Sequence, residues 1–401
     1  ELMGTVIDPL GNPIFSTKSF TKPKQERELD QDVKGIAERS RVKEPLKTGV
    51  TLIDMMIPLG KGQKELLIGN RKTGKTSVLI SIIKSQIQQG IIPIYTLIAK
   101  QQTDIKNLQQ FFLKEGILDK CIIVASTVDD SPGLIFITPL TAFTIAEYFR
   151  DNGQDTVVIL DDLSAHAKLY RQFSLLAKRF PGRESYPGDI FYTHAKLLER
   201  SGNFHHESGK DVSISCFPIV ETVDSDLTAY ISTNIMGMTD GHIFFDSNAF
   251  FQGHRPAINI PLSVSRVGKQ TQSVLKRQIT TEATLLLTQY EKMKNFSHFG
   301  AELSDKSKQI LNTGEQLFEL FNQHYSEVIP EDIQILMFGL VWKGFNAPEI
   351  SQVSKLKKQL MKVYENKDGK KLIETMVQVE NIPDLLKNIT NKGKELFSYI
   401  T

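Results

Sequence analysis

A phosphate-binding pattern that joins a strand directly to a helix constrains the fold of this chain more than any other feature. The segment KELLIGNRKTGKTSVLISIIKSQI contains the pattern G-x-x-x-x-G-K-[ST] between an apolar run and a helical run. Backbone N–H groups of such a loop turn inward around a phosphate, and the following helix adds the positive end of its dipole. The predicted phosphate contacts are Gly69, Arg71, Lys72, Thr73, Gly74, Lys75 and Thr76.

The region around this loop alternates short apolar runs with helical stretches. Continuous apolar runs fit strands that are buried on both faces of a mainly parallel sheet. The alternation therefore predicts an α/β fold. The runs are KELLIG, IIPIYTLI, CIIVAST, TVVILDD, SISCFPIV and HIFFD.

The pattern changes near residue 275, where apolar residues begin to recur at helical spacing. We therefore expect two domains. The first covers residues 1–275, of which 1–45 form an extended surface lead-in, and the second is all-helical and covers residues 276–401. The residues with helical spacing are Leu275, Ile279, Ala283, Leu286 and Tyr290.

Composition and charge exclude several classes of protein. Hydrophobic residues make up 40% and charged residues 23% of the chain, which is typical of a folded globular protein. The net charge is only +2, so no overall field favours nucleic acid or an anionic membrane as a partner. We expect no apolar run of the roughly 18 residues that a membrane span needs. Membrane association should therefore go through partner proteins.

A metal-binding carboxylate is expected on another strand of the same sheet. In phosphate-loop proteins, an Asp at the end of an apolar strand holds the Mg²⁺ of the bound nucleotide, directly or through water. The run TVVILDD ends in two acids, and we assign Asp161 to the metal and Asp162 to its support. The Thr76 hydroxyl is the second predicted ligand. With Lys75, these residues predict binding of ATP or ADP together with Mg²⁺.

Further sequence blocks give the chain a family resemblance. They read GTVIDPLGNPI, EPLKTGVTLIDMMIPLGKGQKELLIG, PGRESYPGDIFYTHAKLLERSG and GHRPAINIPLSVSRVG. In the order, spacing and identity of these blocks the chain resembles the α subunit of the F-type ATP synthase headpiece, over nearly its whole length. The resemblance implies a β-barrel, a RecA-like P-loop nucleotide domain and a helical C-terminal domain. We expect the barrel to be absent, because Glu1 falls where the nucleotide domain begins.

The resemblance also implies partners and a location. Chains of the α and β types alternate in a hexamer around a central γ-like stalk, with catalytic sites mainly on β and non-exchanging nucleotides mainly on α. Such a rotary motor sits at the inner face of a bacterial membrane or in an organelle matrix. The expected localisation is therefore cytoplasmic and peripheral to the membrane through partner subunits.

The resemblance places the nucleotide base near the segment FFQGHRP, where it implicates Phe250, Arg255 and Pro256. An aromatic face and a proline ring can pack against adenine. The stretch FNQHYS corresponds to one that carries glutamines over the base in the family, but Asn322 and His324 stand there instead. Whether these two residues contact the base stays open.

The residue aligned with the catalytic base is a lysine. Hydrolysis requires a carboxylate that deprotonates the attacking water, and catalytic relatives carry a Glu in a G-E-R-like motif. This chain has YTLIAKQQTDI, with Lys100 at that position. A protonated lysine can hold a nucleotide but cannot accept a proton, so the site is expected to bind ATP without turnover. If Lys100 instead points to solvent, the conclusion is unchanged, because no carboxylate replaces it.

Arg266, in the segment SVSRVG, matches a family arginine that reaches across the subunit interface into the neighbouring β-type site. There it meets the charge that develops on the γ-phosphate, so Arg266 is the predicted finger supplied in trans.

Other hypotheses remain open. Asn70, Lys72 and Lys100 depart from the usual α-subunit sequence, which allows a divergent F-type-like motor, as in wall-less bacteria, whose output is not proton transport. A homohexameric export ATPase or RNA translocase is disfavoured by the missing Glu. A spacer that has lost nucleotide binding is disfavoured by the intact Lys75 and Asp161.

Overall fold

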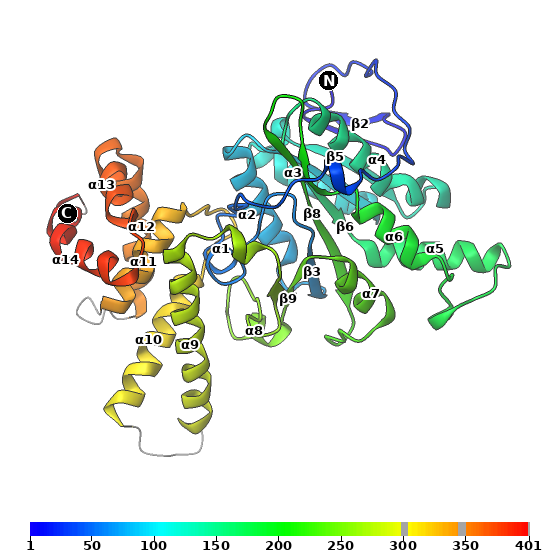
Figure 1. The fold of residues 1–401 in the computed structure, drawn as a ribbon. Coiled ribbons are helices and arrows are strands. Elements are labelled where there is room, and N and C mark those ends of the chain that lie inside the picture. Colours follow the sequence, from blue (N-terminus) through cyan, green and yellow to red (C-terminus); the bar gives the residue numbers. More distant parts are fainter. Residues whose placement is uncertain (298–303, 344–349, 400–401) are drawn as a thin grey trace.

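Within residues 1–297, 304–343 and 350–399, which the computed structural model describes, a mixed ten-stranded sheet organises the first two thirds of the chain (Figure 1). The strand order is β10-β9-β3-β8-β6-β4-β5-β1-β2, and β7 pairs with β8. Neighbours from β9 to β1 are parallel, whereas β2, β7 and β10 are antiparallel to their partners. The strands are β1 (Thr5–Ile7), β2 (Pro13–Ser16), β3 (Glu65–Asn70), β4 (Ile92–Lys100), β5 (Ile122–Thr127), β6 (Thr156–Asp161), β7 (Gly202–His205), β8 (Asp211–Thr222), β9 (Gly241–Phe245) and β10 (Val264–Ser265).

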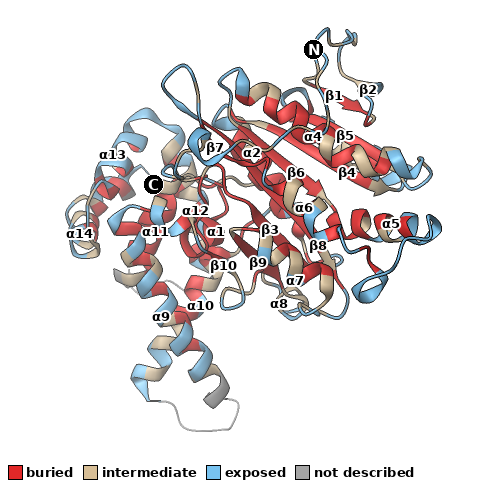
Figure 2. Cartoon of the chain, turned by 45° about the vertical axis from the view of Figure 1, so that its right-hand side comes forward, coloured by how far each residue is buried: buried red, intermediate tan, exposed pale blue. Residues whose placement is uncertain are grey.

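Helices cover both faces of this sheet. Strand side chains alternate between the faces, so Leu67 of β3 enters one core while Leu66 and Ile68 enter the other. The first core also takes side chains from α2 and α3, and the second from α4 to α7. Figure 2 shows the central strands of the sheet almost entirely buried and the outer helix faces exposed. These helices are α1 (Thr51–Met56), α2 (Lys75–Gln88), α3 (Gln102–Lys114), α4 (Pro132–Asp151), α5 (Leu163–Leu176), α6 (Ile190–Leu198), α7 (Tyr230–Met238) and α8 (Ser247–Phe251).

The remaining helices form a second, all-helical part beside α1 (Figure 1). Its first helix begins at Val274, and its apolar residues join the first core without interruption. The predicted fold class, an α/β part followed by a helical part, is therefore confirmed. The helices are α9 (Val274–Ser297), α10 (Asp305–Phe321), α11 (Glu331–Lys343), α12 (Ile350–Glu365), α13 (Lys367–Val377) and α14 (Ile382–Ser398).

A buried polar centre joins the two parts. Asp54 of α1 accepts hydrogen bonds from the Thr48 hydroxyl (2.7 Å) and from Gln334 Nε2 of α11 (2.9 Å). Nearby, Lys276 of α9 pairs with Glu331 of α11 at 2.8 Å. Burial raises the pKa of Asp54, and the Lys276 charge opposes that rise. Buried polar groups must be paired to be tolerated, so this centre specifies how α1 seats against α9 and α11.

Helix α4 corrects the expectation that no apolar run reaches the length of a membrane span. It is 20 residues long and its most apolar window of 18 residues has a mean hydropathy of 1.3, so length and composition alone would let it cross a membrane. In the structure it packs against β4, β5 and β6, and 56% of that window is buried. The apolar length reflects a core helix that crosses the sheet.

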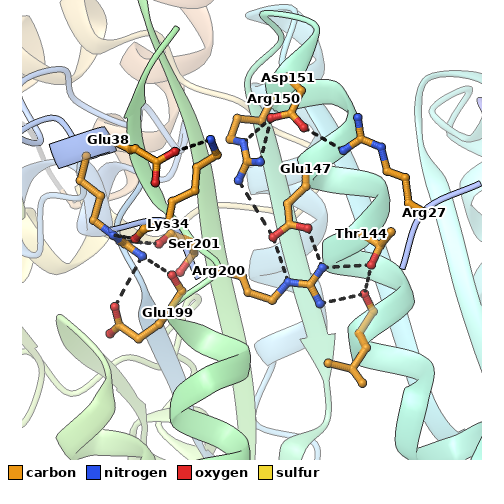
Figure 3. A network of polar contacts seen from close by, with 12 residues as sticks. Arg27, Lys34, Glu38, Thr144, Glu147, Arg150, Asp151, Glu199, Arg200 and Ser201 are labelled. Carbon is orange, nitrogen blue, oxygen red and sulfur yellow. Dashed lines mark hydrogen bonds and ion pairs between the residues drawn. The ribbon is translucent and has the colours of Figure 1, made fainter. Parts of the chain in front are cut away.

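The first 45 residues contain two structures rather than one surface lead-in. Val6 and Ile7 are buried in β1, which extends the sheet beside β5. β2 pairs with β1, and the segment after β2, up to residue 45, contains no strand or long helix and is held by charged groups (Figure 3). Arg27 pairs with Asp151 at 2.8 Å, and the buried Arg200 donates to the carbonyl oxygen of Leu29 at 2.9 Å.

Arg200 is the centre of this network (Figure 3). Its guanidinium donates to both oxygens of Glu147, from Nε at 2.9 Å and from Nη2 at 2.6 Å, and Nη2 also donates to Thr144 Oγ1 at 2.9 Å. Both charged side chains are almost fully buried. A two-bond fork is the geometry in which a buried ion pair is best compensated, so this pair joins α4 to the end of α6.

Two histidines form a buried pair between α5 and α6. His166 Nδ1 and His194 Nε2 are 3.1 Å apart, and His166 Nε2 is 3.1 Å from the carbonyl oxygen of Phe136. Since that carbonyl can only accept, His166 Nε2 carries the proton and His194 Nε2 donates to His166 Nδ1. Burial lowers the pKa of His166 to about 4 and lowers that of His194 well below its ordinary value.

This pair predicts acid sensitivity. The unfolded chain takes up protons on these histidines as the pH falls through about 6.5, whereas the folded chain resists until about pH 4. The contribution of this pair to the free energy of unfolding should therefore be fully present above about pH 6.5 and decline below it. His166 alone should account for a loss of roughly 3 kcal/mol by pH 4. Thermal unfolding between pH 7 and pH 4.5 measures this slope. In the double variant His166→Gln, His194→Gln the slope should flatten, and an unchanged slope would refute the assignment.

Candidate functional site

The phosphate loop starts where β3 ends and closes where α2 begins. Gly69 has φ +155°, and a Cβ there would lie 2.4 Å from the carbonyl oxygen of Phe245 on neighbouring β9. Only glycine lets the backbone pass so close. Gly74, with φ +95°, is the N-cap of α2, whose first-turn N–H groups are free to meet a phosphate.

Lys75 lies inside this loop. Its ammonium donates to the carbonyl oxygens of Gly69 at 2.8 Å and Asn70 at 2.6 Å. Burial lowers the pKa of Lys75 to about 8, against the opposing negative charges of Glu221 and Asp161. A phosphate would bring the compensating charge that this buried ammonium otherwise lacks.

The end of β8 supports the loop from the side. Arg71 Nε pairs with Glu221 Oε2 at 2.6 Å, although the guanidinium itself is mostly exposed. Asn70 Nδ2 donates to Ser225 Oγ at 3.1 Å and to Ser247 Oγ at 3.0 Å. Sequence reasoning missed Glu221. The available signal was its place after the buried run FPIV, because parallel neighbours such as β3 and β8 end at the same edge of a sheet.

An ion-pair cluster lies beside the loop, where the adjacent strands β4 and β6 end. Lys100 Nζ is 2.7 Å from Asp161 Oδ1 and 2.9 Å from Asp162 Oδ2. The other oxygen of Asp161 accepts a hydrogen bond from the Tyr95 hydroxyl at 2.8 Å. The Lys100 side chain is only 19% exposed, so it faces the cluster and not the solvent.

Backbone geometry directs Lys100 toward these acids. The pairing of β4 with β5 shifts between Leu97 and Lys100, and Ala99 takes φ +51° within that irregularity. Burial alone would lower the pKa of Lys100, but the charges of Asp161 and Asp162 outweigh it and raise that pKa. The lysine is therefore charged at every physiological pH.

The predicted metal ligands are not arranged as a metal site. Thr76 is exposed in the first turn of α2, where its hydroxyl can face a nucleotide. Asp161, however, already accepts from Lys100 and Tyr95 on its two oxygens. In the described part of the chain, no group of three or more His, Cys, Asp or Glu is placed to hold a metal ion. These residues fit a nucleotide phosphate but fit poorly a Mg²⁺ ion held by Asp161.

A cavity of about 510 Å³ opens beside the start of α2. Thr73 and Gly74 line its phosphate end. Phe250, Arg255 and Pro256, the predicted base contacts, line its wall, and the Arg255 guanidinium stacks 3.7 Å from the centre of the Phe250 ring. The structure thus brings the loop and the predicted base contacts to one cavity.

The helical part closes this cavity from the other side. Asn322 and His324, the residues at the positions of the family glutamines, both line it. So does Lys357 of α12, a buried lysine that donates to the carbonyl oxygen of Asn322. Gln323, between the two, instead turns inward and donates to the carbonyl oxygen of Gly49 at 2.7 Å. Sequence reasoning missed Lys357, because nothing local connects α12 with the phosphate loop.

Arg266 lies at the opposite edge of the sheet from the phosphate loop. Ser265 of β10 pairs with Gly241, which in turn pairs with Glu65 at the start of β3. The loop leaves β3 at its other end, at Gly69. At about 3.3 Å per residue, the two levels differ by roughly 13 Å along the strand direction. The exposed Arg266 is therefore remote from its own phosphate loop and lies at the rim of the sheet.

Comparison with known proteins follows the same division of the chain. Residues 49–265, more than half of the chain, match the ATP synthase alpha/beta family, nucleotide-binding domain. Residues 270–395 match the ATP synthase alpha/beta chain, C terminal domain. The chain belongs to the ATP synthase alpha/beta family. The resemblance drawn from the sequence blocks is thereby confirmed.

Several relatives align with this ATP synthase alpha/beta chain over nearly its full length, and each is described as ATP synthase subunit alpha. The protein of Clostridium acetobutylicum is 37% identical over 99% of this chain and 79% of its own length. That of Acholeplasma laidlawii is 39% identical over 96% of this chain and 77% of its own. That of Aquifex aeolicus is 38% identical over 98% of this chain and 75% of its own length. The chain is therefore of the alpha type.

Proposed function

We propose that this alpha-type chain holds a nucleotide without hydrolysing it and serves the catalytic site of a neighbouring subunit. ATP or ADP occupies the loop around Lys75 and packs its base against Phe250 and Pro256. The chain alternates with a β-type catalytic subunit in a hexamer around a γ-like central stalk. It reaches the inner face of a membrane only through that assembly, and nucleic acid has no part in it.

The observation that carries this proposal is the lysine at the end of β4. A general base must accept a proton from water, and its loss costs on the order of 10²–10⁴ in rate. Lys100 is charged and paired with Asp161 and Asp162, so it cannot serve. Glu221 is a carboxylate that contacts the loop, and it is engaged by Arg71 at 2.6 Å. The loop itself has every group that phosphate binding needs.

The position of Arg266 supports the second half of the proposal. Arg266 follows β10 and lies level with the first residues of β9 and β3, at the opposite end of these strands from the loop. Its side chain therefore cannot reach a γ-phosphate in its own loop. An exposed arginine at the rim of the sheet suits a site completed by a neighbour. A planar guanidinium matches the oxygens of a phosphoryl group during transfer.

Purification of the chain with and without a co-expressed β-type partner tests the holder role. The chain alone should retain close to one nucleotide per molecule, measured by chromatography after denaturation, and release phosphate at background rate. The complex should hydrolyse ATP.

Several turnovers per second by the chain alone would contradict the holder role. The variant Glu221→Gln then tests Glu221 as the base, which is identified if the activity stops while nucleotide is still retained in the loop that Glu221 supports through Arg71. Heat-induced unfolding of each variant confirms that the fold is retained.

A further inference from the structure

The cluster at the ends of β4 and β6 places a fixed positive charge where a phosphate-loop site normally relies on a divalent ion. Lys100 Nζ bridges Asp161 Oδ1 at 2.7 Å and Asp162 Oδ2 at 2.9 Å. The Tyr95 hydroxyl occupies the second oxygen of Asp161 at 2.8 Å. Asp162 Oδ1 is also used, since it accepts the Ala165 backbone N–H at 2.6 Å as the N-cap of α5.

A divalent cation would have to displace these contacts. The side chains of Lys100, Asp161 and Asp162 are 19%, 15% and 5% exposed, so water screens the cluster little. In such surroundings, two like charges a few ångströms apart repel by several kcal/mol. A metal ion held by Asp161 would sit beside the Lys100 ammonium, and freeing the carboxylate would leave that ammonium unpaired.

The same cluster also reduces the repulsion between the carboxylates and the phosphates, which a metal ion would otherwise have to offset. Two bare carboxylates near the loop would repel a polyphosphate, and a divalent ion usually bridges the two. Here the lysine already offsets one of the two negative charges. The loop adds the Lys75 ammonium, the exposed Lys72 and the N-terminus of α2.

We propose that Lys100 takes the place of the divalent cation, so that this chain holds ATP or ADP in metal-free form. The inference rests on the proposed nucleotide-holding role of the same loop and adds a regulation to it: retention is independent of the Mg²⁺ level. It also sets this site apart from the neighbouring catalytic site, where phosphoryl transfer calls for the metal.

Isothermal titration of the purified, nucleotide-stripped full chain with ATP tests this, once in excess Mg²⁺ and once in EDTA. The parental chain should bind with affinities that agree within about threefold, less than 1 kcal/mol. Lys100→Gln should bind at least about tenfold more weakly in EDTA and recover in Mg²⁺, because the two carboxylates again need a counter-ion. Manganese added to the parental chain with ADP should give no tightly bound Mn²⁺ signal in electron paramagnetic resonance, whereas Lys100→Gln should give one.

One control separates the charge of Lys100 from the general effect of removing a lysine. Lys114→Gln removes an exposed lysine from the end of α3 and should leave both affinities unchanged.

The outcomes distinguish the two proposals. A parental chain that loses more than tenfold in affinity when Mg²⁺ is removed overturns the metal-free inference, while the holder role stands. A chain that binds ATP in neither buffer overturns both. The inference is also refuted if removal of Mg²⁺ changes the ATP affinity of Lys100→Gln by the same factor as that of the parental chain. That result would leave the lysine without a role in charge balance.

Discussion

The substitution Arg266→Ala is expected to lower ATP turnover of the assembled complex by about 10³-fold or more, while the complex still forms. An arginine supplied in trans to a phosphoryl-transfer site contributes on the order of 10³–10⁵ in rate. The exposed Arg266 at the rim of the sheet makes no contribution to its own loop, so nucleotide held by this chain should stay bound. Steady-state hydrolysis by the purified complex, with size-exclusion chromatography for assembly, measures both.

The conservative variant Arg266→Lys sharpens this test. It keeps the charge and loses the planar fork, so turnover should lie between that of Ala and that of the parental complex, and much nearer to Ala. Retained nucleotide serves as the internal control. A complex that assembles with Arg266→Ala and hydrolyses ATP at the parental rate would remove the finger and leave the chain a scaffolding role.

Replacing Lys75 should abolish nucleotide retention in the isolated chain. The ammonium lies buried in the loop, 2.8 Å and 2.6 Å from two backbone carbonyl oxygens, where a phosphate would pair with it. Charge-assisted contacts of this kind are worth about 1.5–3 kcal/mol each, and several phosphate oxygens share this one. Lys75→Ala should therefore carry no nucleotide through purification, and its affinity in titration should fall by at least about a hundredfold.

Lys75→Met is the matched control, because it keeps the buried stem and removes only the charge. It should lose nucleotide as completely as Ala but lose less thermal stability. Lys75 variants that still copurify with a full equivalent of nucleotide would show that the loop is not the site.

Local patterns made part of this site predictable. The loop from Gly69 to Thr76 lies in one contiguous stretch, and the residue types that its pattern fixes, two Gly, Lys75 and Thr76, each have a direct chemical reason. The apolar runs likewise predicted the buried parallel strands, because both cores take alternate side chains from them. The exception was α4, whose composition alone does not distinguish a helix buried against a sheet from one that could span a membrane.

Contacts between distant strands were not predictable in the same way. Whether Lys100 faces solvent, phosphate or Asp161 depends on the irregular pairing of β4 near Ala99, and no residue pattern marks that irregularity. Glu221 and Lys357 reach the site through strand order and helix packing, from segments far along the chain. Their roles follow from the arrangement in space, to which a linear motif gives no access.

The cavity of about 510 Å³ beside α2 is lined by both parts of the chain, so a nucleotide bound there would hold the two parts together. Phe250 and Pro256 belong to the sheet side, and His324 and Ser354 belong to the helical side. A ligand that touches both sides binds only while they are together, so swinging the helices outward must also break its contacts. At a nucleotide concentration 1,000 times the Kd, that adds roughly 4 kcal/mol to the work of opening. A chain that never hydrolyses its nucleotide would then keep its two parts closed throughout a catalytic cycle, while neighbouring subunits change conformation against it.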